Sequence, residues 1–191
     1  MNPDNVLFRP APSFDEPVEM LKACHERIAA KCATLEKLAA YLPVHGADAQ
    51  AQQAARSIMR YFDVAGPNHL ADEEQDLFPM LTEVSERLRS PVAQRIASLL
   101  HEHRSLEAAW TQLRAALADI ADGKATPLEP VSIGNFISGY RDHIAREESE
   151  FFPLAEAWLD QEHLARLSAA MVARRTTKPN DASETPRTRP T

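Results

Sequence analysis

The chain has 191 residues, of which 44% are hydrophobic, 26% are charged and 5 are glycine, a composition that favours one soluble, mainly helical domain. The formal net charge of −7 argues against a nucleic-acid groove, which would need a basic face. No apolar run approaches the length of a membrane span, and the first residues lack the pattern of a secretory signal.

The start of the chain predicts an irregular segment followed by a helix. Residues 1–14 are rich in proline and are expected to be irregular. A first helix should begin near residues 15–17, where acids and a proline suit a first turn, and should run to about Tyr41. Pro43 and Gly46 are expected to stop it there.

The two cysteines of the chain, Cys24 and Cys32, both fall on this first helix. Eight residues separate them, about 12 Å along a helix, which is too far for a disulfide. Free thiols without an export signal favour a cytoplasmic protein. Cys24 is turned about 100° from its neighbour His25 and is predicted to be a core thiol, with a redox or metal role as the alternative.

A second helix is predicted from about Asp48. Gly66 and Pro67 should kink or restart it, because Pro67 cannot donate a hydrogen bond to the carbonyl of Asp63. Pro79 should bend or end the same helix.

The second half of the chain predicts two long helices and a short one. Ser90 as N-cap and Pro91 at the first helical position should start the third helix, which should end before Gly123. A fourth helix should begin within residues 127–132, and a shorter fifth is expected over about residues 162–174.

Four long amphipathic helices joined by short loops predict an all-α, up-down-up-down four-helix bundle over residues 15–175, with a short extra helix at its C-terminal end. No segment with the two-residue period of a strand competes with this interpretation. Residues 176–191 are rich in threonine, proline and charged side chains and are expected to form a disordered tail.

One pattern occurs twice, as His69-Leu-Ala-Asp-Glu73-Glu74-Gln-Asp-Leu-Phe-Pro79 and as His143-Ile-Ala-Arg-Glu147-Glu148-Ser-Glu-Phe-Phe-Pro153. Measured from each histidine, the glutamate pair falls at +4 and +5, the apolar pair at +8 and +9, and the proline at +10. On a helix, the histidine and the first glutamate stack on one face, about one turn apart. The aligned repeat predicts a duplicated metal-binding hairpin.

Each of the four predicted helices has one histidine within its apolar stripe, and two of these are followed four residues later by a glutamate: His25, His69, His103 and His143, with Glu73 and Glu147. One such histidine alone is most often a satisfied core residue, and one His-x-x-x-Glu pair alone is usually exposed. Burying four imidazoles and two carboxylates in one core costs several kcal/mol for each unpaired ion. A bound metal removes that cost.

Four imidazoles and two carboxylates suit a pair of first-row metal ions, with iron favoured and manganese, zinc or cobalt as alternatives. We expect Glu73 and Glu147 to bridge the two ions, and the four histidines to provide terminal nitrogens. Six protein ligands cannot fill two octahedra. Positions therefore remain for water, an oxo or hydroxo bridge, or a diatomic gas.

These residues resemble those of a known family, the hemerythrin-like (HHE cation-binding) domains, over roughly residues 18–160. The resemblance rests on His25, on Glu102-His103, and on the two repeated His/Glu motifs with their Phe-Pro continuations. It implies a non-haem di-iron centre (Fe2+/Fe3+) in a four-helix bundle. The roles it implies are binding O2, sensing O2, iron or redox state, or handling nitric oxide and damaged iron–sulfur clusters.

One position departs from the family pattern. Oxygen-carrying hemerythrins have a second histidine four residues after the first in the third helix, where this chain has Glu107. Two interpretations stay open: Glu107 is an additional carboxylate ligand of the metals, or it is an exposed residue beside the stripe. The loss of a nitrogen ligand favours sensing or redox chemistry over simple reversible O2 carriage.

Three neighbours of the ligand candidates have secondary roles in this interpretation. Tyr140 is predicted to be a core aromatic with its hydroxyl hydrogen-bonded, and could contact the metal ligands from behind. Glu74 and Glu148 point about 100° away from the preceding glutamates and are predicted to be solvated or to lie behind the ligands.

The function expected from these features is a di-iron protein that binds or senses O2, peroxide or nitric oxide, with neither nucleic acid nor membrane as partner. One alternative is a di-iron enzyme that consumes peroxide or nitric oxide, or that donates iron for iron–sulfur cluster repair; its support in the sequence is Glu107. Another is a structural or zinc-binding bundle that acts as an interaction module. The sequence assigns no catalytic residue.

Overall fold

The computed structural model describes residues 12–176, so the expectations for residues 1–11 and 177–191 lie outside it. The described residues are almost entirely helical, as the all-α prediction requires. The helical elements follow one another in the order α1 (Pro17–His45), α2 (Ala49–Arg60), η2 (Tyr61–Ala65), α3 (Gly66–Asp72), η3 (Glu73–Leu77), α4 (Phe78–Leu88), α5 (Val92–Ala121), α6 (Pro130–Arg146), η4 (Glu147–Phe151), α7 (Phe152–Trp158) and α8 (Gln161–Thr176).

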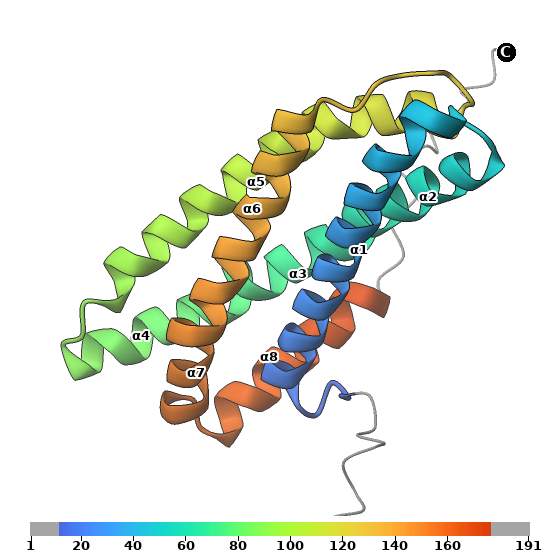
Figure 1. Ribbon diagram of the computed structural model, residues 1–191. Helices are drawn as coiled ribbons and strands as arrows, with labels where there is room; N and C mark the ends of the chain where they lie inside the picture. The colour runs from blue at the N-terminus through green and yellow to red at the C-terminus, as the bar shows by residue number, and fades with distance from the viewer. Residues whose placement is uncertain (1–11, 177–191) are drawn as a thin grey trace, which may run out of the picture.

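Four long helical segments form the bundle, and they alternate in direction along the chain (Figure 1). The first segment is α1, the second runs from α2 through α4, the third is α5, and the fourth runs from α6 through α7. Each segment packs against two others, because α1 contacts α2 and α6, and α5 contacts the same two helices. The predicted up-down-up-down four-helix bundle is therefore confirmed.

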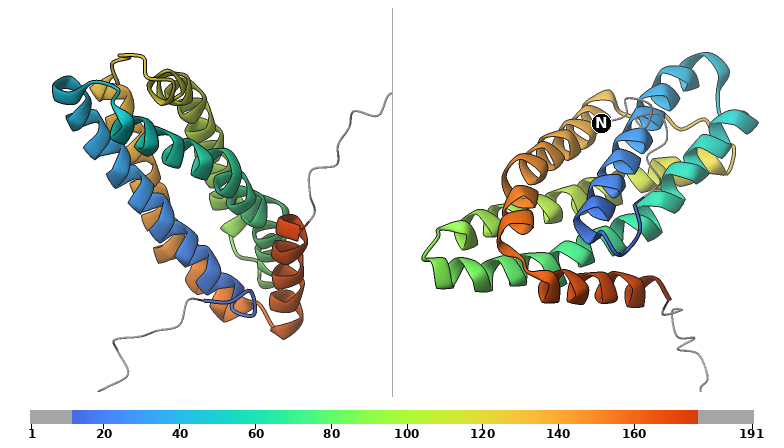
Figure 2. Two further views of the ribbon diagram at one scale, coloured as in Figure 1. Left: turned by 90° about the vertical axis from the view of Figure 1, so that its right-hand side faces the viewer. Right: turned by 90° about the horizontal axis from the view of Figure 1, so that it is seen from below.

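The predicted C-terminal extra helix, α8, lies across one end of the bundle (Figure 2). It packs against α1, α3 and η3, and it buries Leu167 and Met171 completely. Within the described part of the chain, no helix combines the length and the apolar character needed to cross a membrane.

A π-turn precedes each of three prolines that lie inside long helical segments, Pro67, Pro79 and Pro153. In a π-turn the N–H bonds the carbonyl five residues back instead of four, and this widening leaves room for a proline ring. The residue directly before each proline makes this bond, in the pairs Gly66 to Tyr61, Phe78 to Glu73, and Phe152 to Glu147. The helix restarts at Gly66 as expected. Of the bend or end predicted at Pro79, the end is excluded, because α4 continues to Leu88.

Two predicted helix ends also differ from the structure. α1 continues past Pro43, since a proline in the last turn removes one hydrogen bond only, and it ends where the Gly46 N–H bonds the carbonyl of Leu42 at 2.8 Å. Ser90 is not an N-cap: its N–H closes the C-terminus of α4 by bonding the carbonyl of Ser85, and α5 begins at Val92.

The core consists of two apolar clusters with a polar layer between them. The cluster nearer the α1–α2 and α5–α6 loops includes the buried residues Leu35, Ile58, Leu117 and Phe136. The cluster at the other end, which α8 covers, includes Leu21, Phe78, Leu99 and Phe152. The buried polar residues that fall between the two clusters in each helical segment are His25, His69, Asp72, Glu73, His103, His143 and Glu147. This layer is the candidate site.

Candidate metal centre

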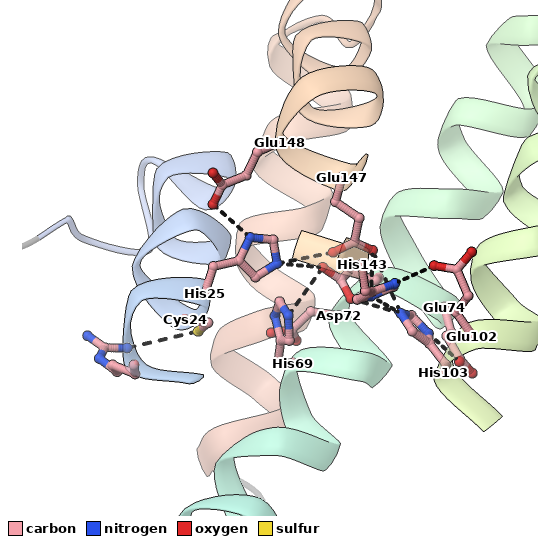
Figure 3. A network of polar contacts seen from close by, with 12 residues as sticks. Cys24, His25, His69, Asp72, Glu74, Glu102, His103, His143, Glu147 and Glu148 are labelled. Carbon is pink, nitrogen blue, oxygen red and sulfur yellow. Dashed lines mark hydrogen bonds and ion pairs between the residues drawn. The ribbon is translucent and has the colours of Figure 1, made fainter. Parts of the chain in front are cut away.

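All four helical segments contribute to the polar layer, and its side chains converge on the bundle axis (Figure 3). The histidines lie on α1, α3, α5 and α6, one on each, and are at most 2% exposed. Glu73 and Glu147 are the first residues of the π-turns η3 and η4 and are fully buried. A π-turn in the middle of a helix often marks a functional position, and here two such turns begin at the paired glutamates.

The converging side chains form two groups of four possible ligands, and within each group the donor atoms lie within 4.8 Å of one another. One group contains His25 and His69, the other contains His103 and His143, and Glu73 and Glu147 belong to both. The structure thus brings together six of the seven residues that the sequence nominated.

Each glutamate directs one carboxylate oxygen to each group. Glu73 Oε1 lies 3.8 Å from His25 Nε2 and 3.4 Å from His69 Nε2, whereas its Oε2 lies 3.7 Å from His103 Nε2. Glu147 Oε2 lies 3.1 Å from His25 Nε2, and its Oε1 lies 3.3 Å from His143 Nε2. Each group therefore has two imidazole nitrogens and two carboxylate oxygens.

Several of these inward atoms are buried without a hydrogen-bond partner among the described residues: His25 Nε2 and both carboxylate oxygens of Glu73 and Glu147. Buried polar groups without partners are rare in native proteins and call for an explanation, such as an ion. The carboxylate oxygens in particular are acceptors without a donor. A cation shared by these atoms would satisfy them.

The separation of two inward nitrogens fits the same conclusion. His103 Nε2 and His143 Nε2 lie only 2.9 Å apart. Both rings direct their Nδ1 atoms at carboxylates, so with both rings neutral each Nε2 carries a lone pair, and two lone pairs at this distance repel unless a proton or a metal ion lies between them. Two nitrogens about 2.1 Å from one ion, at a right angle, would lie roughly 3.0 Å apart.

Three of the four histidines have a carboxylate behind the ring. His103 Nδ1 lies 2.7 Å from Glu74, His25 Nδ1 lies 3.0 Å from Glu148, and His143 Nδ1 lies 3.1 Å from Glu102. Glu74 and Glu148 lie on the π-turns η3 and η4, whereas Glu102 lies on α5. Such contacts fix the tautomer and ring orientation of a metal-binding histidine and make its other nitrogen a better donor.

Other positions of the sequence repeat lie behind the histidines: Glu74 and Glu148 do so as one of their two predicted positions, whereas the role of the aromatic residues at +9 was not predicted. In each copy, the glutamate at +5 and the aromatic residue at +9 both contact one histidine of another helix. Phe78 stacks on the ring of His103, with centroids 5.9 Å apart, just as Phe152 stacks on His25 at 5.1 Å. The matching +9 positions in the two copies were the available signal for this role.

Without a metal, the cluster holds protons. Burial opposes the charge on His25, but the nearby carboxylates of Glu147 and Glu73 outweigh this and raise its pKa to about 10. The balance is similar at His103, where burial is outweighed mainly by Glu147 and the pKa rises to about 9. Burial and then the charge of Glu147 raise the pKa of Glu73 to about 7. Burial and then the neighbouring His25 lower the pKa of His69.

Glu107, the seventh residue nominated as a metal ligand, does not join the others. Its side chain is exposed, and it lines a cavity of about 320 Å³ together with Phe62, Leu70, Trp110 and Tyr140. The structure agrees with the second interpretation of Glu107, an exposed residue beside the stripe.

Two further side chains named from the sequence lie in the core. Tyr140 is buried in the apolar cluster nearer the α1–α2 loop, but its hydroxyl, predicted to be hydrogen-bonded, makes no such bond within residues 12–176. Cys24 is a buried free thiol, in line with the prediction, and so is Cys32.

Asp72, directly before Glu73, has a role that the sequence did not reveal. It is fully buried and receives hydrogen bonds from Arg174 and Arg175, both on α8, the second at 2.6 Å. Arg174 also bonds Asp76 at 2.6 Å. The extra helix is thus fastened to the residues on either side of the start of η3.

Comparisons with known proteins agree with this geometry. Residues 16–155 match the family model of the hemerythrin HHE cation-binding domain. The chain is also 32% identical, over 166 residues, to a Haemophilus influenzae protein described only as an uncharacterized protein, and the match covers 87% of this chain and 94% of that protein. Since the family match spans the four bundle segments and all six converging side chains, the chain belongs to the hemerythrin HHE cation-binding domain family.

Proposed function

We propose that the protein binds two iron ions in the polar layer and uses them to bind or sense a small oxidant or gas, such as O2, nitric oxide or peroxide. The observation that supports this most directly is the pair of donor groups that share both glutamates. Sharing of two carboxylates is the arrangement expected when two ions lie side by side. Each ion would take two imidazole nitrogens and one oxygen from each glutamate.

The donor set supports iron. Imidazole suits zinc, copper, iron and nickel, whereas carboxylate suits harder ions such as manganese, so an equal mixture of the two fits iron well. Bound iron would supply one-electron redox chemistry and positions at which a small molecule can bind. Four protein donors for each ion leave two of six octahedral positions to other ligands.

The surroundings of the site support a small ligand. The six converging side chains are at most 2% exposed, and apolar clusters close the layer on both sides. A molecule of a few atoms can reach such a position through the fluctuations of a packed bundle, whereas a larger substrate would need a cleft. Among the chain's own groups, the buried rings of Phe78 and Phe152 keep water from the imidazoles on which they stack.

The test is anaerobic reconstitution of metal-free protein with Fe2+. We expect two iron ions per chain by elemental analysis, and changes in the near-ultraviolet and visible spectrum on adding O2 or nitric oxide. Glu147→Ala should lose the two-iron stoichiometry, because it removes an oxygen from both donor groups. The matched control is Glu150→Ala, whose side chain pairs with Arg95 at the surface. Less than one tightly bound iron per chain would contradict the proposal.

The enzymatic alternative had Glu107 as its support in the sequence, and the exposed position of that side chain removes this support. Turnover of peroxide or nitric oxide by the reconstituted protein, above that of free iron, remains the direct measurement for it.

A further inference from the structure

The two donor groups look alike at their centres. The rings of His25 and His69 meet edge to face with centroids 5.0 Å apart, and those of His103 and His143 do so at 4.6 Å. Both groups share the same two glutamates. The clearest difference between the two groups lies behind the rings.

In the His103/His143 group, the outer nitrogen of each ring has a carboxylate partner. Glu74 accepts from His103 Nδ1 at 2.7 Å, and Glu102 accepts from His143 Nδ1 at 3.1 Å. Arg146, one turn after His143, forms an ion pair with Glu102 and holds that carboxylate in place. Both rings of this group are oriented by an anion.

In the His25/His69 group, only one of the two rings has a carboxylate at its outer nitrogen. Glu148 accepts from His25 Nδ1 at 3.0 Å, but His69 Nδ1 is buried without a hydrogen-bond partner among residues 12–176. His69 is only 2% exposed, so its ring is out of contact with bulk solvent. A neutral imidazole without an acceptor behind it is a weaker donor, and its tautomer is not fixed.

The sequence explains the asymmetry. Glu102 directly precedes His103, and the corresponding residue before His25 is Cys24, a buried thiol. Arg146 lies three residues after His143, and the corresponding residue after His69 is Asp72, a buried carboxylate bound by arginines of α8.

We propose that the two metal positions are inequivalent, and that the ion held by His25 and His69 is the weaker-bound, exchangeable one. This inference rests on the proposed two-metal function. Loss of a partner behind a metal-binding histidine typically lowers affinity about 10- to 100-fold, and we expect the two binding steps to differ by a factor in this range. The His103/His143 position fills first and empties last. An exchangeable ion beside a retained one suits a protein that responds to metal supply or to an oxidant at one of its two ions.

The experiment is a titration of the metal-free full-length chain with Co2+, followed by calorimetry and by the visible absorption of the bound ion. We expect two steps separated by about 10- to 100-fold. His69→Ala should abolish the weaker step and leave the tighter one, whereas His143→Ala should abolish the tighter one. In Glu102→Ala the tighter step should weaken by about 10- to 100-fold, so that the two steps merge. Glu83→Ala, on an exposed pair with Arg87, serves as the control and should leave both steps unchanged.

The outcomes separate this inference from the proposed function. If fewer than two ions bind, the two-metal proposal itself fails. If two ions bind with equal affinity, or if His69→Ala removes the tighter step, the two-metal proposal stands and the inequivalence is wrong. Circular dichroism of each metal-free variant checks that it is folded, and Glu102→Gln, which can still accept a hydrogen bond without the charge, provides a milder second variant.

Discussion

At the scale of single residues, the site is defined by buried inward atoms, several of which have no hydrogen-bond partner among residues 12–176. The inward nitrogens and oxygens face one another in the middle of the bundle, and the outward nitrogens of three histidines face carboxylates. Within each repeat, the first glutamate faces the centre of the site, and the next glutamate orients an imidazole of another helix.

The first prediction concerns protons at the site. The pKa of His25 is raised to about 10 and that of His103 to about 9 in the metal-free protein, so both rings are protonated at neutral pH. A metal ion needs them neutral, and binding should therefore release protons. Because each ring is protonated below its raised pKa, the apparent metal affinity should increase from about pH 7 to about pH 10 and then level off.

Calorimetric titrations at about pH 7.5, in two buffers of different ionisation enthalpy, measure the number of protons released. An affinity that does not change between pH 7 and pH 9, with no proton release, would contradict the raised pKa values of these two histidines.

The second prediction concerns the ring that stacks on His25. Phe152→Leu and Phe151→Leu both replace a fully buried ring in the same apolar cluster, and each should destabilise the protein by about 1–2 kcal/mol. Of these two rings, Phe152 stacks on His25, with ring planes only 14° apart. Metal affinity should therefore fall in Phe152→Leu and stay near that of the natural chain in Phe151→Leu. Equal affinities in the two variants would show that the stacking has no role.

At the scale of elements, the π-turns allow prolines inside long helices, and two of them, η3 and η4, begin at the paired glutamates. The contact between α5 and α6 depends in turn on a glycine. A Cβ at Gly139 would lie 3.0 Å from Leu106 Cδ2, whereas a Cβ at Gly134, on the same helix, would meet nothing within 4 Å. Alanine substitutions at these two glycines therefore distinguish the effect of helix propensity from the effect of packing.

The third prediction uses this pair. Gly134→Ala should stabilise the protein by up to about 1 kcal/mol, because alanine is the better helix former and space is open. Gly139→Ala gains the same propensity but forces the buried Leu106 to shift, so its net effect should be smaller or destabilising. Urea unfolding of the two variants gives the comparison. If Gly139→Ala stabilised as much as Gly134→Ala, the close approach of α5 and α6 would be wrong.

At the scale of the whole molecule, α8 converts a four-helix bundle into a bundle with one end covered. Its arginines reach the fully buried Asp72, beside the start of η3, and its Leu167 and Met171 complete the apolar cluster there. The helix therefore links the stability of the C-terminal segment to the region around Glu73.

The fourth prediction tests this attachment. Asp72→Ala leaves two arginines, whose side chains are 17% and 24% exposed, without their buried carboxylate, and should destabilise the protein by about 2–4 kcal/mol. Protease cleavage within α8 should become faster. The control Glu83→Ala removes an exposed pair, which is worth about 1 kcal/mol at most. Equal stability of the two variants would mean that Asp72 does not hold α8.

The sequence by itself determined the helices, the bundle and the six converging side chains, because a helix fixes which residues share its inner face. His25, His69, His103 and His143 lie in apolar stripes, so packing those stripes together turned the imidazoles toward the bundle axis. Only the tertiary structure decided what depends on contacts between helices. Glu102, Glu74 and Glu148 reach the outer nitrogens of histidines on other helices.

Two positions show the limit of the helical pattern. Glu107 lies one step off its stripe, and periodicity did not decide whether it is buried or exposed; the packing of α5 placed it at the surface. The absence of a partner behind His69, among the described residues, follows from Cys24 on a different helix, and no spacing within either helix encodes it. Local periodicity sets the direction of a side chain relative to its own helix axis, while its partners depend on how the axes pack.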